Sequence, residues 1–496
     1  MKNHSVYTYT YNKMKPRYAK KWLGPLGLTA TILALALGCK ADPGEPAGKD
    51  DESGASNTVE RRLLAEFKGS FPEDASPNGE VVNFEFAAAP SEIELLPGFK
   101  TKIWAYDGSV PGPTLRIRLG QTMRLKFTNS LSQPTTIHWH GVRVPHAMDG
   151  VPGVTQPPIK PGETFVYEFT PKDPGTFWFH PHVRGAEQLE RGLYGALIVE
   201  DAKPAPYSRD LIWVLDDWRL TEDAQIYDQF VTGGDISHDG RWGNVPTVSG
   251  QVQPTIMVKP GERIRLRLIN SANARIFRPD FSSLKATGIA FDGMTASKPF
   301  DPTGYDLAPG NRLDLDITIP IGAKEDTFQI VDRFTRQPFV LAELKIEKSD
   351  PISPKLFESP ATARIPAWRE VMDLEVDTKM VLNARRGGKY GIEWLINGRP
   401  WNEHESLKLK HGEMQRLQFV NQSFRLHPMH IHGLFFKVVA RNGKPVEEPH
   451  WRDTVLVYPN ETIDVGVVPL DKGKWLTHCH IQEHAEAGMM TLVEVE

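Results

Sequence analysis

Between residue 70 and the C-terminus, apolar and polar residues alternate in short runs that glycine and proline separate. The alternation is clearest in a segment that occurs three times, at residues 115–129, 256–270 and 407–421. Each copy contains a glycine and an asparagine nine positions apart, with an Arg-Leu pair between them. Because side chains two positions apart share one face of a strand, each copy predicts two half-buried strands joined by a turn.

A second repeated element supports the same division of the chain. It occupies residues 161–169, 309–317 and 459–467, so both elements recur at a spacing of about 140 to 150 residues. That spacing has the size of a domain, and 496 residues are too many for a single core. We therefore predict an all-β fold of three tandem β-sandwich domains, at residues 69–203, 204–348 and 367–496. The proline-rich segment 349–366 is the predicted linker that lets the third domain fold back.

The N-terminal pattern differs from the rest of the chain. Five basic residues between positions 13 and 21 precede an apolar run over residues 22–38, which ends at Cys39. The run is short for a membrane span and favours an export signal over residues 1–39. Gly38 before Cys39 resembles the bacterial lipoprotein signal, in which the cysteine is lipidated, although Ala36 departs from that pattern. An ordinary cleaved signal and an uncleaved anchor are the alternatives.

The residues that follow the signal are almost entirely polar. Residues 40–60 cannot bury enough apolar surface to fold, so residues 40–68 are predicted to be a flexible tether. These features predict an exported protein, periplasmic or in the cell envelope, which contacts a bacterial membrane only through an N-terminal lipid or signal anchor. We expect a monomer. The net charge of −4 gives no reason to expect a nucleic acid as partner.

The chemistry of the chain is concentrated around Cys479. His484 follows it by five positions and Met489 by ten. A cysteine, two histidines and a distant methionine form the ligand set of a blue copper site, so Cys479 and His484 can supply strong ligands and Met489 a weak axial one. His478 and His480 flank Cys479, and in a strand they point to its opposite face, toward a second metal site.

Other histidines provide partners for these two imidazoles. One His-x-His pair is weak support for a metal site, because such pairs occur by chance on surfaces. Here ten of the sixteen histidines lie in four short segments, which chance does not explain. The three segments outside the Cys479 motif contain His138 and His140, His180 and His182, and His427, His430 and His432.

These four motifs, in this order, resemble the multicopper oxidases, a family that includes laccases and bacterial copper-efflux oxidases. The resemblance covers roughly residues 70 to 496. It implies cupredoxin-like Greek-key domains and four copper ions: one type 1, one type 2 and two type 3. By resemblance, the type 1 ligands are His427, Cys479, His484 and axial Met489, the type 2 ligands are His138 and His430, and the two type 3 sets are His140, His180, His480 and His182, His432, His478.

The second domain lacks these motifs. Its strand at residues 326–332 corresponds to the strands that lead to His180 and His478, but it has no histidine. We therefore expect the second domain to be a spacer without copper, with its His238 in solvent. Since ligands come from both ends of the chain, the three-copper site is expected between the first and third domains.

Two carboxylates stand beside the ligand motifs, Asp149 and Glu483. By the family resemblance both match acids that relay protons to the three-copper site, and the alternative is that they orient ligand imidazoles. The two roles are compatible. Asp453 lies in a recurrent family segment, where either a contact near the blue copper or a cap at a strand end is expected.

The resemblance implies an oxidase that removes single electrons from a substrate at the type 1 copper and reduces O2 to water at the other three. Phenols, aromatic amines and reduced metal ions are the candidate substrates. The chain has no methionine-rich insertion, which argues against a dedicated cuprous site, and Trp394, Trp401 and Trp451 either line an aromatic pocket or belong to the core. The alternative function is copper homeostasis, by cuprous oxidation or by sequestration. A copper nitrite reductase would not need eight histidines outside the blue site.

Overall fold

In a computed structural model, which describes residues 52–70, 75–362 and 367–496, each repeated segment forms two strands that belong to different sheets. In the first copy, β3 (Leu115–Arg118) lies in one sheet and β4 (Thr122–Asn129) in another. The turn between them contains Gly120, whose φ of +91° is a conformation that glycine adopts without strain. The predicted strands and turn are confirmed, and the turn carries the chain from one sheet of a sandwich to the other.

The repeated asparagine closes the loop that follows the second strand. The Asn129 side chain donates hydrogen bonds to the carbonyl oxygens of Gln133 and Ile159, and its Oδ1 accepts one from the backbone N–H of Leu131. Asn270 and Asn421 make the corresponding bonds in the second and third copies. All three are buried, so the side chain satisfies loop backbone groups that water cannot reach.

The first sandwich has two four-stranded sheets, ordered β2-β1-β4-β6 and β3-β8-β7-β5. Its other strands are β1 (Val81–Leu96), β2 (Phe99–Tyr106), β5 (His138–His140), β6 (Thr164–Phe169), β7 (Gly175–His180) and β8 (Gly195–Glu200).

The second sandwich pairs a six-stranded sheet, β10-β9-β12-β16-β14-β15, with a four-stranded sheet, β11-β18-β17-β13. Its strands are β9 (Arg209–Trp218), β10 (Val245–Val248), β11 (Thr255–Val258), β12 (Arg263–Asn270), β13 (Pro279–Asp280), β14 (Thr287–Phe291), β15 (Met294–Phe300), β16 (Arg312–Thr318), β17 (Thr327–Asp332) and β18 (Phe339–Ile346).

The third sandwich pairs a six-stranded sheet, β20-β19-β22-β27-β24-β25, with a five-stranded sheet, β21-β29-β28-β23-β26. Its strands are β19 (Val376–Arg386), β20 (Ile392–Ile396), β21 (Leu407–Leu409), β22 (Gln415–Asn421), β23 (His427–Ile431), β24 (Phe436–Arg441), β25 (Lys444–Pro445), β26 (Thr454–Val457), β27 (Thr462–Val467), β28 (Gly473–Cys479) and β29 (Met490–Val495).

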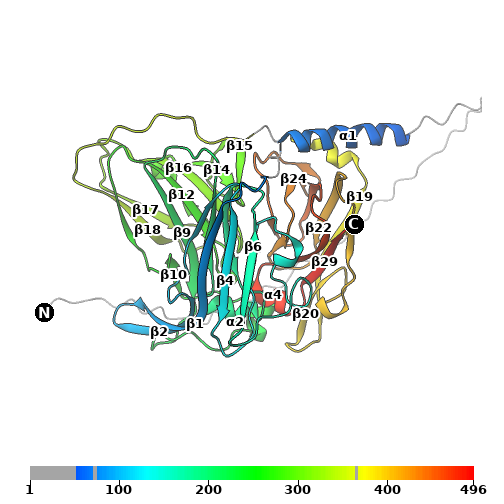
Figure 1. The fold of residues 1–496 in the computed structure, drawn as a ribbon, viewed down its shortest axis with the longest axis horizontal. Coiled ribbons are helices and arrows are strands. Elements are labelled where there is room, and N and C mark those ends of the chain that lie inside the picture. Colours follow the sequence, from blue (N-terminus) through cyan, green and yellow to red (C-terminus); the bar gives the residue numbers. More distant parts are fainter. Residues whose placement is uncertain (1–51, 71–74, 363–366) are drawn as a thin grey trace, which may run out of the picture. The chain divides into compact units, whose positions relative to one another are not determined.

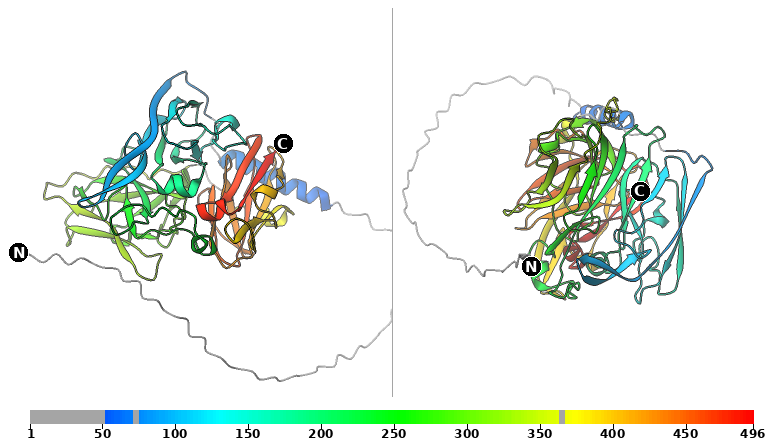
Figure 2. Two further views of the ribbon diagram at one scale, coloured as in Figure 1. Left: turned by 90° about the horizontal axis from the view of Figure 1, so that it is seen from below. Right: turned by 90° about the vertical axis from the view of Figure 1, so that its left-hand side faces the viewer.

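Figure 1 shows the three sets of strands in chain order, the first in blue to cyan, the second in green and the third in orange to red, and Figure 2 shows that they surround a common centre. The predicted all-β fold of three cupredoxin-like sandwiches is confirmed, while the exact domain limits stay predictions. The one long helix among the described residues is α1 (Glu52–Ser70). The others are short: α2 (Gly185–Glu190), α3 (Gly233–Ser237) and α4 (Gln482–Glu486), with 3₁₀ turns at His146–Met148, Ser282–Leu284, Arg369–Asp373 and Trp401–Glu403.

The N-terminal helix differs from the prediction of a flexible tether over residues 40–68. Helix α1 begins at Glu52, and its Leu63 and Phe67 side chains, four positions apart on one face, are buried. The Phe67 ring packs against Trp451 at 5.5 Å and Trp368 at 5.9 Å. This contact orders the helix against the third sandwich. Residues 40–51 and the predicted signal with Cys39 lie outside the described residues.

No helix among the described residues is long and apolar enough to cross a membrane.

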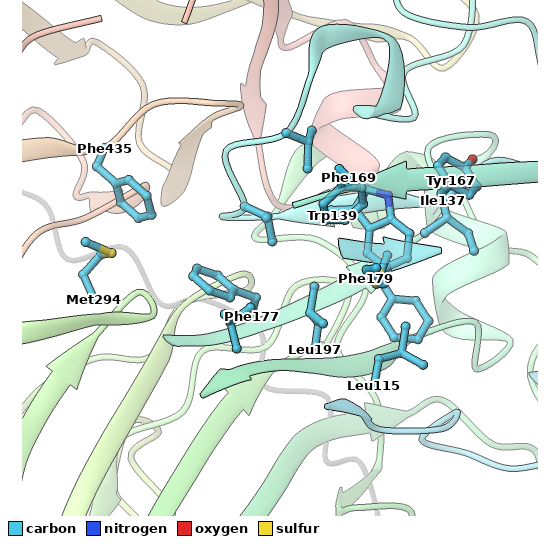
Figure 3. Close-up of a cluster of buried hydrophobic side chains, with 14 of the residues drawn as sticks. Leu115, Ile137, Trp139, Tyr167, Phe169, Phe177, Phe179, Leu197, Met294 and Phe435 are labelled. Atoms are coloured by element: carbon cyan, nitrogen blue, oxygen red, sulfur yellow. Dashed lines mark hydrogen bonds between the residues drawn. The ribbon is translucent and has the colours of Figure 1, made fainter. Parts of the chain in front are cut away.

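Alternation along the strands places core residues and histidines on opposite sides. In β5 the Trp139 side chain enters the core of the first sandwich, between His138 and His140, which face away from it. In β7 the Phe177 and Phe179 side chains enter the same core (Figure 3). The packing of these large aromatic side chains thus fixes the direction in which the histidines point.

Candidate metal centre

Four strands bring the predicted ligands of the first and third sandwiches together. In β5 and β7, His138 lies opposite His180. In β23 and β28, His430 lies opposite His478, and Met429 lies opposite Cys479. The two pairs of strands face each other, because the His138 ring stacks on His432 at 3.7 Å and the His140 ring on His430 at 3.8 Å. The structure therefore brings the two sets of histidines to one interface, where the sequence predicts the three-copper site.

Eight histidines meet at this interface, all buried except the half-buried His182, and seven of them form three overlapping clusters. Each cluster offers three ring nitrogens that lie within 4.8 Å of one another. His478 joins them through its Nε2, which lies 3.2 Å from Nε2 of His432. The three clusters are His138, His140, His430; His138, His182, His432; and His140, His180, His480.

In several of these histidines, one ring nitrogen makes a hydrogen bond and the other has no hydrogen-bond partner among the described residues. Nδ1 of His138, His180 and His430 donates to backbone carbonyl oxygens, at 2.8, 3.1 and 2.9 Å. In His140 the hydrogen-bonded nitrogen is Nε2 rather than Nδ1, and it lies 3.3 Å from Asp453 Oδ1. The remaining nitrogens are buried without a hydrogen-bond partner among the described residues: Nε2 of His138, His180, His182, His430 and His480, and Nδ1 of His140.

Burial sets the protonation state of these imidazoles. It lowers the pKa of His140, His180, His182, His432 and His480 well below the ordinary value, and the charge of neighbouring imidazoles adds to the effect. Neutral imidazoles present lone pairs, and a backbone bond at the other nitrogen fixes the tautomer. Several converging lone pairs without partners would be costly to bury. The donor set therefore fits metal ions.

A fourth cluster lies on the other face of β28. Cys479 Sγ is 3.6 Å from His427 Nδ1 and 3.8 Å from His484 Nδ1, and these two nitrogens are 3.2 Å apart. The outer nitrogens are held away from the thiol: His427 Nε2 bonds Ser423 Oγ at 2.8 Å, and His484 Nε2 donates to the His238 carbonyl oxygen at 2.7 Å. Three soft or borderline donors thus converge in a buried pocket, as copper prefers.

The remaining residues near this cluster are apolar. Met489 is fully buried in the same group of side chains as Cys479, and its carbonyl oxygen accepts a hydrogen bond from the Cys479 N–H at 3.1 Å. The Trp394 ring lies 4.4 Å from the His484 ring and 4.8 Å from the His427 ring. Trp451 packs instead against Phe67 of α1, and Trp401 stacks on His404. Of the three tryptophans, Trp394 alone contacts these histidine rings.

The two predicted acids occupy different positions. Asp149 is fully buried, and its Oδ2 accepts a hydrogen bond from His432 Nδ1 at 2.9 Å. Glu483 is also fully buried, and its carboxylate accepts hydrogen bonds from the Arg241 N–H at 3.0 Å and the Asn273 side chain at 3.1 Å. Burial raises the pKa of Glu483 to about 7, against the effect of these donors. Asp149 therefore touches the histidine clusters, whereas Glu483 is held by the second sandwich.

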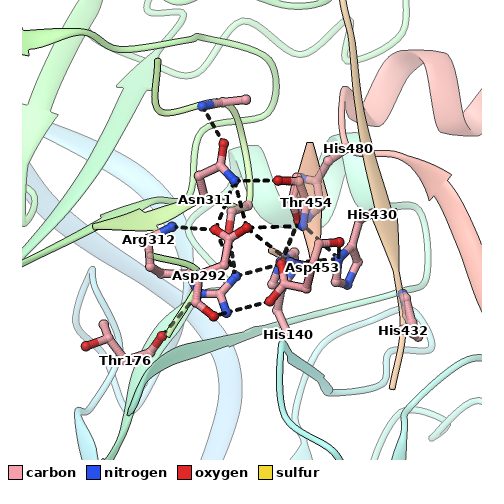
Figure 4. A network of polar contacts seen from close by, with 12 residues as sticks. His140, Thr176, Asp292, Asn311, Arg312, His430, His432, Asp453, Thr454 and His480 are labelled. Carbon is pink, nitrogen blue, oxygen red and sulfur yellow. Dashed lines mark hydrogen bonds and ion pairs between the residues drawn. The ribbon is translucent and has the colours of Figure 1, made fainter. Parts of the chain in front are cut away.

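Asp453 lies at the interface that holds the three histidine clusters, rather than beside the Cys479 cluster. Its carboxylate is 3.3 Å from His140 Nε2, and its carbonyl oxygen accepts from His430 Nδ1 at 2.9 Å. The Arg312 guanidinium donates two hydrogen bonds to this carboxylate, of 2.9 and 2.6 Å (Figure 4). Although burial raises it, the neighbouring Arg312 and His430 bring the pKa of Asp453 down to about 2. The carboxylate is thus held ionised beside two predicted ligands.

The second sandwich supplies this support, which the sequence did not reveal. Asp292 accepts hydrogen bonds from the Asn311 side chain and from the backbone of Asp453 and Thr454 (Figure 4). The interpretation of this domain as a spacer is therefore incomplete, since Arg312, Asp292 and Asn311 position residues beside the histidines. One signal was available: Arg312 occupies the place that threonine has in the other two copies of the second repeated element.

Comparison with known proteins agrees with this geometry. Two sequence profiles described as multicopper oxidase match residues 88–204 and 368–496. The multicopper oxidase MmcO of Mycobacterium tuberculosis is 29% identical over 473 residues, which cover 85% of this chain and 89% of that protein. Copper resistance protein A of Escherichia coli is 25% identical over 86% of this chain and 94% of that protein.

Solved structures show the same relationship. The multicopper oxidase of Pseudomonas thermotolerans is 32% identical, with a TM-score of 0.73 over 84% of this chain and 99% of that one. The Campylobacter jejuni multicopper oxidase, described as a metallo-oxidase, is 26% identical, with a TM-score of 0.71 over 86% of this chain and 94% of that one. On these grounds, and with all four ligand motifs in place, the chain belongs to the multicopper oxidase family.

Proposed function

We propose that the four clusters hold the four copper ions of a multicopper oxidase, with the ligands that the family resemblance assigns. The strongest support is that Cys479, the last residue of β28, lies in one cluster, while its neighbour His480 lies in a histidine cluster and His478 contacts His432. The type 1 ligands are then His427, Cys479, His484 and axial Met489; the type 2 ligands His138 and His430; and the type 3 ligands His140, His180, His480 and His182, His432, His478.

As a multicopper oxidase, the protein is an oxidoreductase with one type 1, one type 2 and two type 3 coppers. Its substrates are O2 and a small reducing compound such as a phenol or a metal ion. When bound, the coppers take single electrons from the reductant and supply four electrons to O2, which leaves as water. The chain's own contribution to electron transfer is the short covalent route from Cys479 to His478 and His480, its neighbours in sequence.

The experiment that tests this function is oxygen uptake by the copper-loaded protein. Rates with Cu(I), Fe(II), Mn(II), a dimethoxyphenol and bilirubin would also rank the substrates. A second candidate function, copper sequestration or cuprous oxidation in copper homeostasis, gains support from the copper resistance relatives. Copper binding without oxygen uptake would favour sequestration, and a rate that is highest with Cu(I) would favour cuprous oxidation.

We also propose that Asp149 and Glu483 relay protons for oxygen reduction. Water formation consumes four protons, and both carboxyls are buried close to the clusters. Asp149 contacts His432 directly, so it can both orient that imidazole and pass a proton. With a pKa that burial raises to about 7, Glu483 can gain and lose a proton near neutrality, as a relay group requires.

The substitutions Asp149→Asn and Glu483→Gln should each slow reoxidation of the reduced protein by about a hundredfold, because an amide keeps the shape but cannot carry a proton. In the Glu483→Gln protein the loss should grow as the pH rises from 6 to 8. The Glu483 carboxyl, with a pKa of about 7, still collects protons in this range, whereas the concentration of free hydronium falls tenfold per pH unit. Rapid mixing of the reduced variants with O2 measures this step.

The control for the relay experiment is the anaerobic reduction of the blue copper by substrate, together with copper content. Both should match the wild type in each variant. If reoxidation stays fast while substrate oxidation slows, the two acids act on the substrate side and the relay assignment is wrong.

We propose that residues 1–39 direct export and that Cys39 is lipidated, with domain limits as the sequence predicts. The change Cys39→Ala should then move the protein from the membrane fraction to the soluble fraction or stall its maturation, because lipidation needs the thiol. Fractionation followed by immunodetection measures this, and oxygen uptake per molecule should not change. Equal membrane association of the variant would instead indicate an uncleaved apolar anchor.

A further inference from the structure

The segment Thr232–Arg241 of the second sandwich, here called the covering segment, lies over the Cys479 cluster. It contains helix α3 (Gly233–Ser237), and its Ile236 side chain is fully buried in the same apolar group as Cys479 and Met489. The covering segment therefore covers the His484 ring on the side of its Nε2.

The covering segment occupies the outer nitrogen of His484. Nε2 of His484 donates to the His238 carbonyl oxygen at 2.7 Å, and the His484 side chain is fully buried. Because Nδ1 faces Cys479 and His427, Nε2 is the one remaining polar atom of this ring. An organic substrate that hydrogen-bonds to a ligand imidazole would need the same N–H, which the backbone carbonyl already holds.

Contacts on several sides hold the covering segment closed. Trp394 Nε1 donates to the Ile236 carbonyl oxygen at 2.9 Å, the Leu426 N–H donates to Asp239 Oδ1 at 3.1 Å, and the Arg241 N–H donates to Glu483 at 3.0 Å. Gly240 has a φ of +79°, and a Cβ there would lie 2.5 Å from Ile481. The segment thus follows the third sandwich closely, with no room for an aromatic ring beneath it.

The outer side of the covering segment suits a cation. The His238 side chain is exposed, and its Nδ1 donates to the Gly234 carbonyl oxygen at 2.9 Å and lies 3.1 Å from Ser237 Oγ, which leaves Nε2 as the lone-pair nitrogen. The half-exposed Asp239 carboxylate follows it, with Arg425 Nη1 as its nearest positive group at 3.9 Å. A surface imidazole and a carboxylate are ordinary ligands of divalent metal ions.

We infer that the covering segment determines substrate specificity: it keeps organic reductants away from His484, while its His238 and Asp239 side chains would receive reduced metal ions on the outer side, where the His238 carbonyl links the segment to His484. The inference rests on the proposed type 1 ligands. A ferrous ion gives up one electron and no proton, so it needs only a short path to the copper. A phenol gives up one electron and one proton, and it needs a contact that the covering segment occupies.

The test loosens the covering segment at both ends. In the double substitution Thr232→Val and Asp239→Ala, the cap of α3 on Asp235 N–H and the bond to Leu426 N–H are lost. Hydrogen–deuterium exchange of the amides in residues 232–241 should rise by about tenfold, since each lost hydrogen bond shifts opening several-fold. The ratio of kcat/KM for dimethoxyphenol to that for Fe(II) should rise by about tenfold as well.

The matched control is Asp223→Ala, which removes a hydrogen bond of 2.5 Å from Thr221, in the same connection between β9 and β10 but before the covering segment begins. It should change neither exchange in residues 232–241 nor the substrate ratio. Thr232→Val alone keeps the Asp239 carboxylate in place, so it should raise the substrate ratio in the same direction, and it carries the test if the double variant loses its blue colour.

Three outcomes would overturn the inference. The first is fast exchange of residues 232–241 in the wild type, which would mean an open site. The second is faster exchange in the variant without a change in the substrate ratio. The third is a wild-type kcat/KM for dimethoxyphenol equal to that for Fe(II). Absence of blue colour and of oxygen uptake in the wild type would instead refute the proposed function itself.

Discussion

Replacement of Cys479 by serine should remove the intense thiolate-to-copper absorption and all oxidase activity. The thiolate is the ligand that gives a blue copper site its colour, and the covalent route to His478 and His480 begins at the same residue. A serine hydroxyl beside His427 and His484 is a harder donor with weaker affinity for copper. Visible absorption, copper content and oxygen uptake measure the three consequences.

The other three coppers provide the internal control for this substitution. The eight histidines of the interface are untouched in Cys479→Ser, so up to three coppers should stay bound. The converse substitution, His432→Ala, should keep the blue colour and stop oxygen reduction, since His432 belongs to a histidine cluster that does not include Cys479. A blue Cys479→Ser protein would rule out Cys479 as the type 1 ligand.

The sequence was sufficient to predict the sandwiches and the ligand clusters, because both depend on local spacing. The glycine and asparagine of each repeated segment act within a few residues, in a turn and in a loop. Pairs of histidines likewise lie two apart, on a strand or within two residues of its end, so the two-residue period of a strand sends them to one side. Cys479 and its flanking histidines separate onto opposite faces for the same reason.

Contacts between distant segments could not be predicted in this way. Leu63 and Phe67 lie in a polar stretch, and their burial depends on Trp368 and Trp451, about 300 to 400 residues away in the chain. His238 was expected in solvent, and its side chain is exposed, but its backbone carbonyl bonds His484. The sequence does not indicate a hydrogen bond of this kind, because every residue has a backbone carbonyl.

The ion pair of Arg312 with Asp453 also joins segments that are distant in the chain. Its removal should have a large effect on stability. Arg312 is fully buried, and it bonds the Asp453 carboxylate and the carbonyl oxygens of Thr176, Gly310 and Asp292. With Arg312→Met, Asp453 would remain buried without its ion-pair partner. The free energy of unfolding should fall by about 3–5 kcal/mol at pH 7, as when one partner of a buried ion pair is removed.

The pH dependence of this loss follows from the pKa of Asp453, which Arg312 helps to hold at about 2. In the wild type the pair stabilises the fold above the ordinary carboxyl pKa, and this contribution disappears as the pH falls toward 2. In the variant the pKa of Asp453 should rise above its ordinary value, so the variant loses stability as the pH increases. The difference between the two proteins should therefore be largest near neutrality, shrink as the pH falls toward 4, and shrink further toward pH 2.

Denaturant unfolding of both proteins at pH 7 and at pH 4 measures this difference. The control is Arg369→Met, which removes a salt bridge to Glu447 whose side chains are 62% and 56% exposed. That change should cost less than about 1 kcal/mol at either pH. If Arg312→Met destabilised the protein no more than Arg369→Met at pH 7, the second sandwich would not hold Asp453 in place. If Arg312→Met destabilises the protein more than Arg369→Met, the electron route from the type 1 copper to the type 3 coppers should still be intact, because Cys479 and its strand are unchanged. The defect should appear instead as weaker copper retention at His140 and His430.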